Sequence, residues 1–135
     1  MSSMHVRVRA GNEHYALPVG GVREIAKLGE ITPVPGAPAV VLGVWNLRGD
    51  VMAVLDLATL LGLGGTEPGR IVVVEEGDLH GGLAVESVLD VGAMPEPLEP
   101  TDSEFLLGAV LVERVPVGVI DLGAVLGAVS TGADQ

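Results

Sequence analysis

The sequence predicts an all-β fold made of two similar halves, with only short helical turns. Three observations support this prediction: valine-rich runs in which apolar residues alternate, frequent turn residues between them, and an internal repeat. β-Branched residues in short alternating runs bounded by turn residues are typical of strands. The 135-residue chain contains 20 glycines and 9 prolines, which divide it into segments of strand length.

The clearest of the expected strands are six short β-rich runs, at residues 6–9, 15–19, 51–55, 71–74, 83–85 and 115–120. Helical turns are expected at three places. The first is 22–25. The other two, 56–62 and 121–127, each begin with an aspartate that can cap a helix and end with a glycine that can terminate one.

The internal repeat relates the two halves of the chain. Asp56 and Asp121 lie 121 − 56 = 65 residues apart, and at this offset the pair Leu42-Gly43 matches Leu107-Gly108. In the first strand of each half the same offset aligns Val6 and Val8 with Ile71 and Val73. With one extra residue in the second half, the segment 17–25 matches 83–91.

This repeat predicts a single two-lobed domain over residues 5–128. The first repeat covers about 5–62, a linker covers 63–69, the second repeat covers about 70–127, and 129–135 is expected to be a flexible tail. Each half is roughly the size at which a domain is only marginally stable alone. We therefore expect two small β-barrels that share an apolar seam.

Composition excludes several classes of function. The net charge is −11 and the seven basic residues are scattered, so the chain should repel nucleic-acid phosphates. No apolar run is long enough to span a bilayer, and the first residues show no secretory signal. The absence of cysteine is compatible with a reducing compartment.

No set of residues suggests catalysis or metal binding. The three histidines have no ligand spacing, and none of the five serines lies in a nucleophile elbow. We therefore expect no enzyme activity, no metal and no cofactor, and we predict a binding protein. The polar residues inside otherwise apolar segments then become the candidate site: Glu24, Asn46 and Arg48.

Arg48 has two equally weighted interpretations. In the first, it fixes a turn by binding a backbone carbonyl or a carboxylate, with Gly49 forming the turn itself. In the second, it is an anchor that faces a partner, because arginine is enriched at interface cores. The tripeptide Arg48-Gly49-Asp50 also matches a cell-adhesion motif, but the segment lies inside an alternating apolar run and the chain shows no secretory signal.

Several motifs occur in a characteristic order: YALPVGGVREI at 15–25, TPVPGAP at 32–38, VLGVWNLRG at 41–49, GLAVESV at 82–88 and the closing IDL at 120–122. In this order they resemble the CheW-like chemotaxis coupling proteins over about residues 5–127. Three features depart from the family pattern. Ala53 stands where the family usually has proline, Glu86 stands where it usually has aspartate, and the loop 94–105 is short.

The resemblance implies a pair of SH3-like five-stranded barrels and an adapter without enzymatic activity. Such an adapter bridges the cytoplasmic tip of methyl-accepting chemoreceptors to the regulatory domain of a CheA-type histidine kinase. It would be cytoplasmic, recruited to receptor arrays at the inner face of the membrane, and not inserted in the bilayer.

The resemblance also implies which residues bind partners. Val22, Glu24 and Ile25 match the segment tied to receptor and kinase contacts, and Arg48 matches the arginine of the family's Asn-Leu-Arg-Gly element. The apolar seam, lined by Val85 and Val88 on its second side, would take a helical hairpin of the receptor. The full set of predicted partner-binding residues is Val22, Glu24, Ile25, Asn46, Arg48, Gly49, Val85 and Val88.

Two other functions compete with this one. The first is a related scaffold of a pilus or developmental pathway outside swimming chemotaxis. The second, from another class, is a small-molecule-binding β-barrel or a minor hydrolase, which would require a deep polar pocket.

Overall fold

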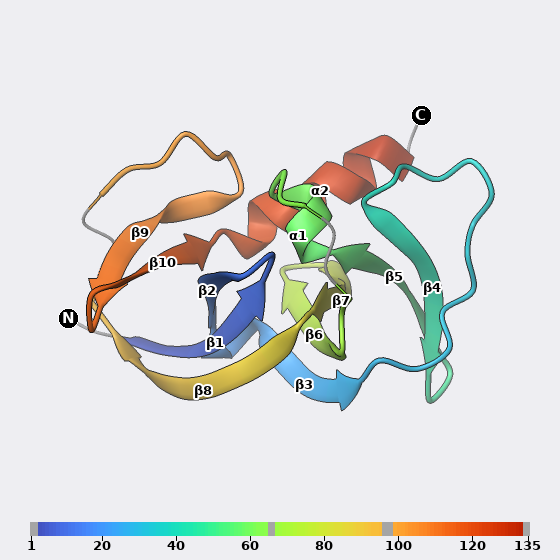
Figure 1. Cartoon of the computed structure of the whole chain (residues 1–135). Coiled ribbons are helices and arrows are strands. Elements are labelled where there is room, and N and C mark those ends of the chain that lie inside the picture. Colours follow the sequence, from blue (N-terminus) through green and yellow to red (C-terminus); the bar gives the residue numbers. More distant parts are fainter. Residues whose placement is uncertain (1–2, 65–66, 96–98, 134–135) are drawn as a thin grey trace.

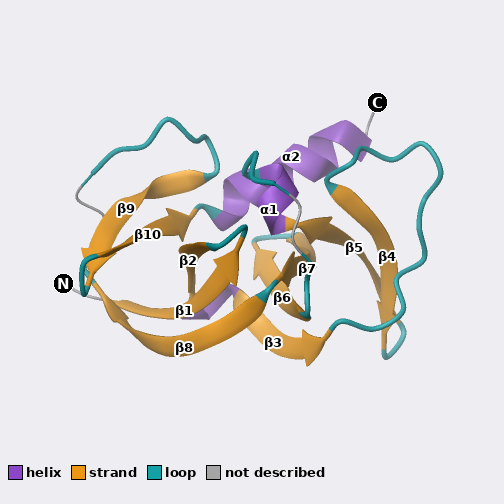
Figure 2. Cartoon of the chain, viewed as in Figure 1, coloured by secondary structure: helices purple, strands orange, loops and turns teal. Residues whose placement is uncertain are grey.

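A computed structural model describes residues 3–64, 67–95 and 99–133. These residues form two five-stranded sheets with few helices (Figures 1 and 2), which confirms the all-β prediction. Sheet A has the strand order β8-β1-β2-β10-β9, and sheet B has the order β3-β6-β7-β5-β4. The strands are β1 (Ser3–Ala10), β2 (Glu13–Pro18), β3 (Val22–Lys27), β4 (Val41–Leu47), β5 (Asp50–Asp56), β6 (Arg70–Glu76), β7 (Leu79–Val85), β8 (Ser87–Met94), β9 (Leu106–Val112) and β10 (Val115–Ile120).

The two sheets do not coincide with the two halves of the sequence. Sheet A joins β1 and β2 of the first half to β8, β9 and β10 of the second, while sheet B joins β3, β4 and β5 to β6 and β7. Parallel pairing of β2 with β10, and of β5 with β7, holds each mixed sheet together. Each lobe is therefore built by exchange between the repeats, so neither repeat forms a sheet alone.

The structure corrects the alignment of the first strand in each half. Val6 and Val8 lie in the same apolar cluster as Val72 and Val74, whereas Ile71 and Val73 lie in a different one. The offset in this strand is therefore 66 residues and not 65. A shift of one residue moves every side chain to the opposite face of a strand, which is why burial decides between the two alignments.

Three apolar clusters make up the core. The largest lies between the sheets and includes Leu17, Leu55, Leu83 and Ile120. A second cluster, around Val117 and Val119, is formed by residues of sheet A, and a third, around Met52 and Val54, by residues of sheet B. This pattern matches the predicted shared seam between two lobes, while closed SH3-like barrels stay a prediction.

Two helices cover the centre of the molecule: α1 (Leu57–Leu60) and α2 (Leu122–Ala133). The helix α2 packs on β6 and β7 (Figure 1). At its start the backbone N–H of Ala124 donates to Asp121 Oδ1 at 3.1 Å, as expected for a cap. The helix continues to Ala133, so most of the segment 129–135 that was expected to be a flexible tail is helical, and residues 134–135 lie outside the described part.

One predicted element is wrong. Residues 22–25, expected to form a helical turn, belong to the strand β3, and the only turn of 3-10 helix nearby precedes it at Val19–Gly21. The reason is tertiary pairing, because Glu24, Ile25 and Ala26 pair antiparallel with β6. Burial also alternates along β3, as a strand with one buried face requires.

Candidate functional site

The β4–β5 hairpin ends in a tight turn that carries Arg48 at its tip. Leu47 pairs with Asp50, so Arg48 and Gly49 form a two-residue loop. Both have positive φ, 51° and 90°, as a type I′ turn requires. Asn46 supports this conformation, because its Oδ1 accepts a hydrogen bond of 2.8 Å from the N–H of Gly49. We call residues 47–50 the Arg48 turn.

Arg48 forms an ion pair with Glu24 of β3. The strands β3 and β4 are the two edge strands of sheet B, so this contact brings opposite edges of the sheet together. Backbone hydrogen bonds join the same two edges, because Thr32, which follows β3, and Val44 of β4 exchange two hydrogen bonds of 2.9 Å. The Arg48 side chain is nevertheless 71% exposed, which leaves most of this side chain open to a partner.

A β-bulge brings a second charged residue of β3 to the Arg48 turn. The register of β3 against β6 shifts between Val22 and Glu24, so Arg23 is an extra residue. Its guanidinium lies 3.6 Å from Asp50 Oδ2 and 3.7 Å from Glu75 Oε2. His80 Nε2 lies 3.2 Å from Asp50 Oδ1. Bulges commonly redirect side chains near functional sites. This one allows two adjacent residues of β3, Arg23 and Glu24, to pair with Asp50 and Arg48 of the turn.

The predicted site residues separate into two groups. The first group, Glu24, Asn46, Arg48 and Gly49, gathers at the Arg48 turn, and Ile25, next to Glu24 on β3, is 42% exposed. The second group packs inward: Val85 is fully buried in the central cluster, and Val22 and Val88 are half-buried against it. Val85 therefore offers no surface to a partner in this structure.

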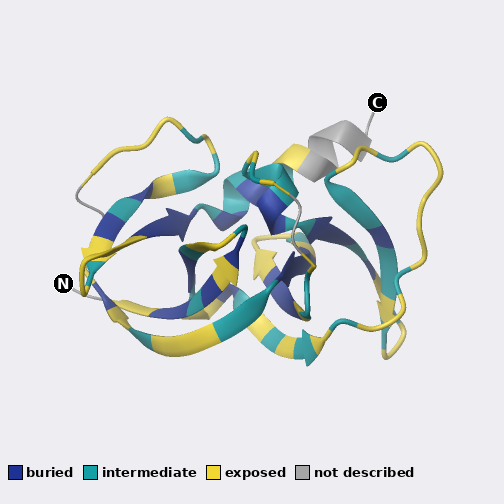
Figure 3. Ribbon diagram, viewed as in Figure 1, coloured by how far each residue is buried: buried dark blue, intermediate teal, exposed yellow. Residues whose placement is uncertain are grey.

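Two groups of exposed residues were not predicted from the sequence. Arg23 and Asp50 were not identified because their roles depend on the bulge and on contacts across the sheet. Leu89 and Val91 of β8 are 39% and 54% exposed, and they are the counterparts of Arg23 and Ile25 at an offset of 66. This signal was present in the repeat. Figure 3 shows exposed positions along both β3 and β8.

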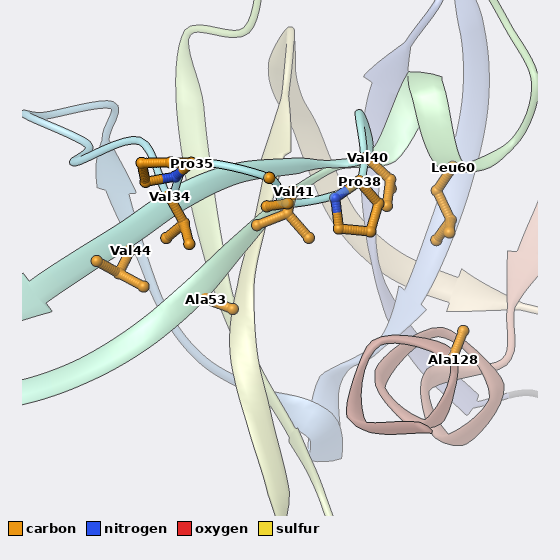
Figure 4. Close-up of a pocket in the computed structure, with 11 residues that line it drawn as sticks. Val34, Pro35, Pro38, Val40, Val41, Val44, Ala53, Leu60 and Ala128 are labelled. Atoms are coloured by element: carbon orange, nitrogen blue, oxygen red, sulfur yellow. The ribbon is translucent and has the colours of Figure 1, made fainter. Parts of the chain in front are cut away.

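An apolar groove of about 400 Å³ lies between the loop before β4, the β4–β5 hairpin and the helices α1 and α2 (Figure 4). Valine, proline, alanine, glycine and leucine make up its lining, so the groove carries no titratable side chain: Val34, Pro35, Gly36, Ala37, Pro38, Val40, Val41, Val44, Ala53, Leu60 and Ala128. Acid–base or nucleophilic catalysis needs such groups. The groove therefore does not provide the polar pocket that the hydrolase alternative requires.

Comparison with known proteins decides the family. A sequence model described as "CheW-like domain" matches residues 5–130. The chain belongs to the CheW-like family. Over 131 residues it is 30% identical to the chemotaxis protein CheW of Rhizobium meliloti, with 89% of this chain and 84% of that protein covered.

Two further comparisons agree with this family assignment. The chain is 32% identical over 112 residues to the protein FrzA of Myxococcus xanthus, covering 76% of this chain and 70% of FrzA. Its fold matches the crystal structure of the scaffolding protein TtCheW from Thermoanaerobacter tengcongensis with a TM-score of 0.81 at 30% identity, covering 90% and 86% of the two chains. The chain is thus a CheW-like scaffold of the chemotaxis type. None of the helices described is long and apolar enough to cross a membrane.

Proposed function

We propose that this chain is a non-enzymatic adapter that couples chemoreceptors to a CheA-type histidine kinase. It would work in the cytoplasm, at receptor arrays on the inner face of the membrane, without a cofactor. The observation that carries the proposal is Arg48, which is 71% exposed at the tip of the β4–β5 hairpin and pairs with Glu24 of β3, in a chain of the CheW-like family.

The Arg48 turn has the properties of an interface anchor. A left-handed backbone at a residue other than glycine costs on the order of 1–3 kcal/mol, whereas an exposed ion pair contributes only about 0–1 kcal/mol. The pair therefore does little for stability, and its strained, exposed position favours a role in binding. Arginine on a preorganised turn suits such a role, because little conformational entropy is lost on binding.

A second surface suits the helical tip of a receptor. Ile25 pairs with Val72, and Val91 pairs with Val6; both partners belong to the central cluster. Ile25 and Val91 therefore lie on the side of each sheet that faces the middle of the molecule. Exposed apolar side chains at such a seam fit the apolar face of a helix, so we assign the receptor tip to this seam, with Ile25 and Val91 in the place that Val85 was expected to fill.

Binding measurements with both partners test the proposal. We expect the chain to bind a receptor tip fragment and a kinase regulatory domain separately. Ile25→Asp should weaken receptor binding, and Leu107→Asp, at an exposed apolar site of β9, is its matched control. A folded chain that binds neither fragment contradicts the proposal.

A related role outside swimming chemotaxis is the second candidate. The chain is also 32% identical to FrzA, a relative whose name does not mention chemotaxis, so membership of the family leaves this alternative open. The genes beside this one separate the two roles, because each kind of pathway brings its own receptor and kinase. An adapter for a pilus or developmental pathway should bind the receptor and kinase encoded nearby, through the same Arg48 turn.

A further inference from the structure

Sheet A has a pocket, lined by both charged and apolar residues, at the end that corresponds through the repeat to the Arg48 turn of sheet B. Its volume is about 290 Å³. The lining comes from β1, β8 and the β9–β10 turn, and includes His5, Arg7, Asp90, Met94 and Glu113.

Differences between the two repeats explain the charged side chains in the lining of this pocket. In sheet B the corresponding apolar cluster contains large side chains, among them Trp45 and Met52. At an offset of 65 their counterparts in sheet A are the smaller Val110 and Val117. At an offset of 66 the apolar Ile71 and Val73 are replaced by His5 and Arg7. His5 and Arg7 therefore bring polar groups to a pocket that also has apolar walls.

The charged residues around the pocket differ in sign from those at the Arg48 turn at one of two equivalent positions. Asp90 is the counterpart of Glu24, and Glu113 is the counterpart of Arg48. Sheet B therefore pairs an acid with its own arginine, whereas sheet A places two acids at the equivalent positions. Asp90 instead binds Arg7, with N–O distances of 2.5 and 3.1 Å. Within the described part of the chain, Glu113 forms no ion pair.

His5 adds a hydrogen-bond acceptor to the pocket. The residue is only 8% exposed, and its Nδ1 lies 3.1 Å from the carbonyl oxygen of Ser3. A carbonyl can only accept, so Nδ1 donates this hydrogen bond, and in the neutral tautomer that carries this proton Nε2 is an acceptor. No hydrogen bond to Nε2 is found among the described residues. The pocket therefore offers acceptors from His5 and Glu113 and has net negative charge, because Arg7 is neutralised by Asp90.

We propose that this pocket binds a cationic side chain, arginine or lysine, of a partner protein. Such a group supplies several N–H donors to the acceptors, and its methylene stem can lie along Met94 and Val112. A divalent metal ion is the less suitable occupant, since no group of three potential ligands is placed to hold one in the described residues. The net charge of −11 favours a basic partner. This inference is independent of the adapter function proposed above.

The test is an NMR titration of the whole chain with a blocked arginine, N-acetyl-arginine methylamide. Blocked citrulline, which has the same shape but no charge, is the matched control ligand. We expect saturable shifts at the His5 ring and the Glu113 amide with the arginine probe only. Glu113→Gln should weaken binding about tenfold, the loss expected for one hydrogen bond to a charged group, whereas Asp78→Asn, at another exposed turn, should not.

Refilling the pocket gives a second, independent test. His5→Ile, which introduces the residue of sheet B at this position, should abolish the shift of the Glu113 amide while circular dichroism shows an intact fold. If this variant does not fold, Glu113→Gln alone decides. Equal shifts with citrulline, no shifts with either probe, or undiminished binding by Glu113→Gln overturn the proposal. Tighter binding of spermidine than of the arginine probe would assign the pocket to a free polyamine and overturn the assignment to a protein side chain.

Discussion

Arg48 and Glu24 form an ion pair although they lie on opposite edges of the same five-stranded sheet. Glu24 is available at this point because Arg23, beside it, is the extra residue of a bulge in β3. Glu24 thus pairs with Arg48, and Arg23 pairs with Asp50. The contact joins the two edge strands of sheet B and leaves the Arg48 side chain exposed.

Charge reversal at Arg48 separates binding from folding. Arg48→Glu should weaken binding to the kinase regulatory domain by more than about 1 kcal/mol, roughly fivefold. The midpoint of thermal unfolding should barely change, because an exposed ion pair contributes about 0–1 kcal/mol. Calorimetry of binding and of unfolding measures the two effects. In the double variant Glu24→Arg with Arg48→Glu the ion pair should re-form while binding stays weak; unfolding of the single variant would instead support the interpretation of Arg48 as a turn-fixing residue.

A glycine should stabilise the β9–β10 turn, which is the counterpart of the Arg48 turn in sheet A. Glu113 and Arg114 both have positive φ, 51° and 70°, where the first turn has glycine at its second position. Arg114→Gly should therefore raise the free energy of unfolding by about 0.5–1 kcal/mol, because glycine adopts this conformation without strain. Urea denaturation measures the change. A decrease in stability would show that the Arg114 side chain makes a stabilising contact that outweighs the strain.

Gly43 should not tolerate a side chain. A Cβ at this position would lie 2.2 Å from the carbonyl oxygen of Thr32, the residue that bridges the chain after β3 to β4. Gly43→Ala should therefore lower the free energy of unfolding by about 2 kcal/mol or more, as expected when a backbone contact and its hydrogen bonds are disrupted. Gly20→Ala is the matched control, since no atom lies within 4 Å of its Cβ. Equal effects of both substitutions would contradict the close approach.

Tyr15, the only tyrosine in the chain, should titrate at unusually high pH. Burial, and secondly the negative charge of Glu13, raise the pKa of the Tyr15 phenol above its ordinary value near 10. The folded state therefore holds this proton more tightly than the unfolded state. The resulting contribution to stability is complete below pH 10 and is lost as the pH rises through the folded-state pKa. Absorbance of the tyrosinate measures the midpoint, and a midpoint equal to that of the chain in denaturant would contradict the prediction.

The sequence allowed the fold class, the repeat and most of the Arg48 turn to be predicted. Short β-branched runs are a local signal, and the Asn46-to-Gly49 element marks the hairpin that the structure confirms. The exchange of strands between the repeats was not predictable, because both halves have the same local pattern and pairing within or between them buries the same faces. The strand β3 was missed for a similar reason, since its conformation depends on pairing with β6, about fifty residues away.

Among the candidate residues, the errors follow burial. Val85 was placed at a partner surface, but in the structure it is a core residue of the central cluster. An apolar residue in a strand has the same signature whether it faces the core or a partner. The exposed Val91 could have been identified, because it is the counterpart of Ile25 in the repeat.

The most direct measurement is the activity of a reconstituted mixture of receptor, CheA-type kinase and this chain. The account predicts that receptor ligand changes kinase activity only when the chain is present, and that Arg48→Glu greatly reduces this response while the variant remains folded. Ligand control of the kinase that is unaffected by omission of the chain, or full control with Arg48→Glu, would contradict the account.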